Sequence, residues 1–93
     1  MNTMRHELVF KEGVKTLTKE AIEKFTKETK EKLNIVVLSV EVSGNSLIVF
    51  TKGFKLGKKD LQVLIDEVRN DNDPIKVYIE DDVQDFYHSN TWR

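Results

Sequence analysis

The sequence contains no cysteine and no long apolar segment, and each absence narrows what the chain can be. Without cysteine the chain cannot form a disulfide framework, a thiolate zinc site or a cysteine nucleophile. Its apolar runs are far shorter than the roughly 20 residues that a helix needs to cross a bilayer, so we expect no membrane partner. Residues 1–12 lack the apolar core of a secretory signal, which favours a cytoplasmic location.

The net charge is also close to zero, but the basic and acidic residues are unevenly distributed along the chain. The formal charge of −1 provides no general attraction for nucleic acid or for an anionic membrane. Residues 1–59 hold twelve of the fifteen Lys and Arg, whereas residues 60–93 hold nine of the sixteen Asp and Glu. This asymmetry is typical of an acidic binding segment or of head-to-tail self-association, unless folding interleaves both signs on one surface.

The length and composition predict one hydrophobic core. Ninety-three residues are too few for two cores, and 39% apolar with 33% charged residues is typical of a soluble globular domain. We therefore predict a single α+β domain over residues 1–82 and an aromatic C-terminal tail over residues 83–93.

In the first half of the chain, the spacing of apolar residues changes from that of a strand to that of a helix. In a strand over residues 6–10, His6, Leu8 and Phe10 would share one face and Glu7 and Val9 the other, as a half-buried strand requires. Apolar residues then recur at helical spacing up to Leu33, and either Thr16 or Thr18 can cap the start of this helix. Asn34 can end the helix in a left-handed conformation.

The second half repeats the same order of elements. Residues 35–42 and 46–51 are rich in β-branched side chains and flank a short Ser-Gly-Asn turn, which predicts a hairpin. A basic loop over residues 52–59 leads into a helix that begins at Lys58 or Asp60 and ends near Arg69. Turn-forming residues at 70–74 precede a final strand over residues 75–80.

This order of strand, helix, strand, strand, helix, strand resembles the ferredoxin-like architecture. The resemblance implies an α+β βαββαβ two-layer sandwich, in which a four-stranded antiparallel sheet carries both helices on one face. It covers residues 6–80 and rests on element order alone, so it implies no function.

The sequence offers no recognisable catalytic apparatus. Acylphosphatases share the element order, but their phosphate cradle after the first strand ends in an arginine, and residues 11–15 here read Lys-Glu-Gly-Val-Lys. Asp81, Asp85 and His88 would share one face of a helix, yet neither a glycine-shaped calcium loop nor a second ligand helix accompanies them. We therefore expect no enzyme, no cofactor and no metal site.

The feature that most favours a binding function is an apolar outer face of the predicted sheet. We expect this face to carry Val9, Val37 and Tyr78, together with either Leu47 and Val49 or Ile48 and Phe50. Such a face needs a cover, which the tail can provide in cis or a partner in trans. The sequence thus predicts a non-enzymatic interaction or regulatory module of adaptor or inhibitor type, self-associating through its sheet, with these partner-binding residues: Val37, Tyr78, Phe86, Tyr87 and Trp92.

The basic loop supports an alternative, which is binding of nucleic acid or of a phosphate ligand. Lysines and two glycines precede a helix N-terminus there, and an aromatic ring is available for stacking on a base. The residues concerned are Lys52, Phe54, Lys55, Lys58 and Lys59. The opposing interpretation is that Phe54 and Leu56 anchor the loop to the core while the lysines keep it soluble.

Overall fold

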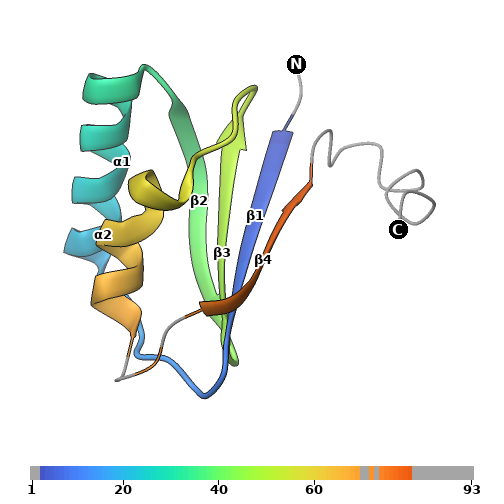
Figure 1. Cartoon of the computed structure of the whole chain (residues 1–93). Helices are drawn as coiled ribbons and strands as arrows, with labels where there is room; N and C mark the ends of the chain where they lie inside the picture. Colours follow the sequence, from blue (N-terminus) through green and yellow to red (C-terminus); the bar gives the residue numbers. More distant parts are fainter. Residues whose placement is uncertain (1–2, 70–71, 73, 81–93) are drawn as a thin grey trace.

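The computed structural model describes residues 3–69, 72 and 74–80, and it has the predicted ferredoxin-like architecture. The elements are β1 (Thr3–Phe10), α1 (Lys19–Leu33), β2 (Val36–Ser43), β3 (Ser46–Lys52), α2 (Lys58–Val68) and β4 (Pro74–Glu80). The four strands form one antiparallel sheet in the order β2-β3-β1-β4. Both helices lie on the same face of this sheet (Figure 1).

Local signals set the boundaries of α1. Thr18 adopts an extended backbone conformation and its hydroxyl accepts a hydrogen bond from the Ala21 N–H at 3.1 Å, so Thr18 rather than Thr16 is the N-cap. Asn34 has a φ of 58° and donates its backbone N–H to the Lys30 carbonyl, which ends the helix in the predicted left-handed conformation.

The hairpin between β2 and β3 is tied to the end of β1. Gly44 has a φ of 61°, which a glycine adopts without steric cost, and Ser43 pairs with Ser46 across the two-residue turn. Asn45 then exchanges two hydrogen bonds with Phe10, one through its side-chain amide and one through its carbonyl, both at 2.8 Å. The tip of the hairpin and the end of β1 therefore form one rigid corner.

The core lies between the helices and three of the four strands. It draws on the sheet residues Leu8, Phe10, Val37, Val40, Leu47 and Val49, on Phe25 of α1, on Leu56, and on Leu61, Leu64, Ile65 and Val68 of α2. No residue of β4 belongs to this cluster. Within the described ranges no helix is long and apolar enough to span a bilayer.

Candidate interaction surface on strand β4

Strand β4 presents apolar side chains that the helices leave uncovered. Val77 pairs with Leu8 and Ile79 with His6, and paired residues of neighbouring strands point to the same face. Leu8 and His6 are fully buried beneath the helix layer, whereas Val77 and Ile79 remain 45% and 40% exposed. The apolar face of the sheet therefore extends onto β4, but the helices do not cover it there.

A groove separates β4 from the nearest helix. Its volume is about 290 Å³, and it is lined by Lys58, Gln62 and Ile65 of α2, by Arg69 just after that helix, and by Pro74 at the start of β4. Ile75 follows Pro74 where the pairing of β1 with β4 shifts register, and it is 61% exposed. The lining of the groove is therefore largely polar and basic, with Ile65 and Pro74 as its apolar members.

β4 is also an outer strand of the sheet, because among the described residues only β1 pairs with it. One row of its backbone N–H and C=O groups therefore has no partner strand within the described part of the chain, and another strand can pair on this side. Lys76 is the single charged residue between the two ends of this strand, and Tyr78 on the opposite face is 45% exposed. Exposed apolar side chains and a free backbone edge coincide on the same seven residues.

The outer face of the sheet agrees with the prediction at β3 and differs from it at β2. Of the two alternatives predicted for β3, Ile48 and Phe50 lie on the outer face, and Leu47 and Val49 are buried beneath the helices. The prediction for Val37 is wrong in its placement: a register irregularity between Val37 and Ser39 accompanies a Val37 side chain that points into the core, where it is 8% exposed.

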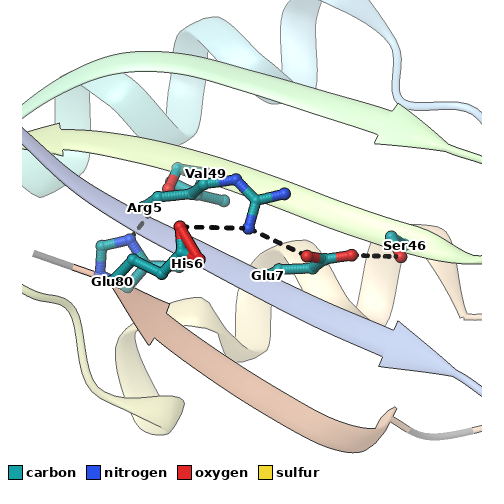
Figure 2. Close-up of polar contacts among 6 residues, drawn as sticks. All are labelled: Arg5, His6, Glu7, Ser46, Val49 and Glu80. Carbon is teal, nitrogen blue, oxygen red and sulfur yellow. Dashed lines mark hydrogen bonds and ion pairs between the residues drawn. The ribbon is translucent and has the colours of Figure 1, made fainter. Parts of the chain in front are cut away.

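A chain of polar contacts crosses the middle of this outer face (Figure 2). Arg5 Nη1 lies 2.9 Å from Glu7 Oε1 and 3.8 Å from Glu80 Oε2, and Ser46 donates its hydroxyl to Glu7 at 2.9 Å. These side chains join β3, β1 and β4. The alternation of Arg5 and Glu7 in the sequence was the available signal for them, but sequence alone did not reveal their partners on other strands.

His6 is the one buried imidazole among the described residues, and its surroundings fix its charge. Nδ1 lies 2.9 Å from the Val49 carbonyl, so it carries the proton, and Nε2 accepts the Leu56 N–H at 2.7 Å (Figure 2 shows the Val49 contact). Burial lowers the pKa of His6 below its usual value of 6.5, although the hydrogen bond to Val49 opposes this shift. His6 is therefore a neutral structural residue that fastens the loop after β3.

The basic loop has one anchor instead of the two expected. Leu56 is fully buried, but Phe54 is 65% exposed although its carbonyl accepts a hydrogen bond from the Thr51 hydroxyl. The lysines of the predicted site, Lys52, Lys55, Lys58 and Lys59, are all exposed. Asp60 accepts the Gly57 N–H at 3.0 Å, so a carboxylate already occupies the N-terminus of α2 where the sequence had suggested an anion.

Comparisons with known proteins provide no relative. No protein-family model, curated protein or solved structure gives a significant match to this chain. Within the described residues, no group of three or more acidic or histidine side chains lies close enough together to hold a metal ion. Functional inference therefore depends on the surface chemistry of this chain alone.

The remaining sequence-predicted residues divide into two groups. Tyr78 is on the outer face of β4 and belongs to the exposed strand just described. Phe86, Tyr87 and Trp92 lie outside the described residues, as does the predicted boundary between domain and tail. The sequence did not indicate that Val77 and Ile79 would be exposed, because their alternation with Lys76 and Tyr78 is that of an ordinary half-buried strand.

Proposed function

We propose that this protein is a non-enzymatic interaction module that binds another protein chain along β4. One observation carries the proposal: Val77 and Ile79 continue the buried face of the sheet and are nevertheless 45% and 40% exposed, on a strand whose outer edge pairs with no other strand of the described residues. An extended segment that pairs with such an edge gains backbone hydrogen bonds, and its alternate side chains cover the apolar residues.

The physical gain from such pairing is substantial for a small domain. Removing apolar surface from water contributes about 25 cal/mol per Å², and large exposed apolar side chains otherwise create a risk of aggregation. Ile75, Val77, Tyr78 and Ile79 account for four of the nine large apolar side chains classed as exposed in the described part of the chain. Binding would therefore relieve the largest uncovered apolar segment of the sheet.

The aromatic residues of the tail remain part of the proposal. Phe86, Tyr87 and Trp92 follow β4 in the chain and would add anchors of the kind that dominate binding energy at interfaces. Truncation after Asp82 tests their contribution. We expect weaker partner binding with an unchanged melting temperature, whereas a large drop in melting temperature would show that the tail contributes to folding in cis.

A displayed library of random peptides tests binding to β4 directly. We expect selection to enrich extended sequences with alternating apolar residues, and Val77→Lys to abolish their binding. Leu38→Lys is the matched control, because Leu38 is 50% exposed on the other outer strand. Peptides that bind both variants equally, or a selection that enriches none, would contradict binding at β4 to a separate chain.

A second candidate function is binding of single-stranded nucleic acid through the basic loop. The observation that favours it is Phe54, which is 65% exposed among four exposed lysines and is available for stacking on a base. Binding of mixed oligonucleotides should weaken as salt rises, with a logarithmic slope of roughly −0.7 per phosphate contacted. Phe54→Ala combined with Lys55→Glu should remove this binding, and an unchanged affinity would contradict the candidate.

A further inference from the structure

The apolar residues of β4 are arranged symmetrically within the strand. Ile75 and Ile79 lie two residues before and two residues after Val77, and Lys76 and Tyr78 occupy the positions between them. A symmetric dimer uses the same surface patch on both subunits, so its interface must be complementary to itself. β4 meets this requirement, because the order of its side chains about Val77 is nearly the same in both directions along the strand.

We infer that the chain bound by β4 is a second copy of this protein, paired antiparallel about a twofold axis at Val77. This inference rests on the proposed function, and it identifies the partner. In this register Val77 faces the partner's Val77, Ile75 faces the partner's Ile79, and Lys76 faces the partner's Tyr78. The alternation of the strand places the isoleucines and valines of both copies on one face.

The cross-strand neighbours in this register are favourable on both faces. The aliphatic face forms three apolar pairs, and such pairs are the unit of stabilisation in a sheet. On the other face, the Lys76 ammonium lies beside the ring of the partner's Tyr78, and its diagonal neighbours are the partner's Glu80 and the partner's Lys76. The carboxylate of Glu80 offsets the repulsion between the two lysines. Pro74 has no N–H to donate, but it falls at the end of the ladder, opposite the partner's Glu80.

Strand β2 is a poorer choice for the same pairing, although it is the other outer strand. Both outer strands have a register irregularity, between Val37 and Ser39 on β2 and beside Ile75 on β4, so this feature does not distinguish them. The difference is that the inward-facing valines of β2 are already covered, so pairing at β2 would bury less exposed apolar surface. Val37, which the sequence analysis placed among the partner-binding residues, is buried in the core.

Pairing through β4 has a consequence for the helix side of the sheet. A twofold axis that relates antiparallel neighbouring strands is perpendicular to the sheet, so both helix layers lie on the same side. The two β4 strands then form an aliphatic floor between the two copies of α2.

Engineered cysteines provide a sharp test, because the natural chain has none. Val77→Cys places two thiols directly opposite each other across the axis, at a separation that a disulfide can bridge. Ile75→Cys and Ile79→Cys should crosslink poorly when each is oxidised alone, since two identical positions are then about 13 Å apart. A mixture of these two variants should crosslink readily, because position 75 faces position 79.

Sedimentation of the full chain completes the test. We expect the wild type and Leu38→Lys to form dimers, and Val77→Lys to raise the dimer dissociation constant at least about tenfold, because two like charges then meet at the axis. Circular dichroism of Val77→Lys and of reduced Val77→Cys checks that each variant folds.

The outcomes separate this inference from the proposed function. A wild type that remains monomeric, or a dimer that crosslinks through Leu38→Cys instead of Val77→Cys, overturns pairing at β4 with a second copy. If the wild type is monomeric and the displayed peptides still require Val77, the binding function stands with a different partner. If neither dimers nor peptides depend on Val77, both proposals fail.

Discussion

The two outer strands of the sheet occupy equivalent positions, and yet their apolar residues end in different environments. On β2, Val37 and Val40 are each 8% exposed and belong to the core. On β4, Val77 and Ile79 are 45% and 40% exposed. The difference arises from the helices, since α1 packs against β2 and the core stops before it reaches β4.

This comparison shows that a strand can have an apolar face without a helix covering that face. Both strands pair with a register irregularity, between Val37 and Ser39 on β2 and beside Ile75 on β4, but α1 packs against β2. The apolar face of β2 is thereby covered, whereas that of β4 remains exposed along an edge with which no further strand of the described residues pairs. This asymmetry is the reason that we propose β4 as the interaction surface.

The largest expected difference between the two strands is the loss of stability when a valine of each strand is replaced by lysine. Val40→Lys buries a charge with no described partner beneath α1, and we expect it to cost at least about 4 kcal/mol or to prevent folding. Val77→Lys reaches solvent, so we expect a change of no more than about 0.5 kcal/mol in dilute solution. Urea denaturation measures both. Similar losses in the two variants would show that β4 is covered after all.

His6 allows the inner border of β4 to be tested, because it is buried beside the exposed Ile79. Its lowered pKa means that the unfolded chain takes up a proton below about pH 6.5 while the folded chain resists doing so. Stability should therefore be greatest above pH 6.5 and decrease as the pH falls towards 5.

Replacement of this histidine should have two effects. His6→Leu leaves the Leu56 N–H without its acceptor, which costs roughly 1–3 kcal/mol at pH 7.5. The same variant should lose the part of the pH dependence that begins near 6.5, while His88→Gln should retain it. Urea denaturation at pH 7.5 and 5 distinguishes them. An identical pH profile in His6→Leu and the wild type would refute the assignment.

The N-terminal contacts of the two helices allow α1, which packs against β2, to be compared with α2 in its contribution to stability. Thr18 caps α1, and Asp60 accepts the Gly57 N–H at the start of α2. Thr18→Ala and Asp60→Ala should each cost about 1 kcal/mol, which corresponds to about 4–8 °C in melting temperature for a domain of this size. Thr16→Ala is the control and should leave the melting temperature unchanged.

The sequence was sufficient for the elements and their order because each depends on local chemistry. Thr18, Asn34 and Gly44 set boundaries through their own side chains or backbone angles, and the alternation in β1 follows from its neighbours in the chain. Burial of Val37 and exposure of Val77 depend instead on where the helices settle on the sheet. The alternation of side chains within one strand carries no information about whether a helix will lie above that strand.

The smallest expected effect concerns the ion pair that joins β4 to β1 on the outer face. Arg5 and Glu80 are 3.8 Å apart and both side chains are nearly four-fifths buried, so Glu80→Gln should cost about 0.2–1 kcal/mol at low salt and less at high salt. Glu41→Gln on β2 is the matched control, because Glu41 is exposed. Chemical denaturation at two salt concentrations measures both. If Glu80→Gln cost no more than this control, β4 would be held by its backbone ladder and side-chain packing alone, which sharpens the contrast with the helix-covered β2.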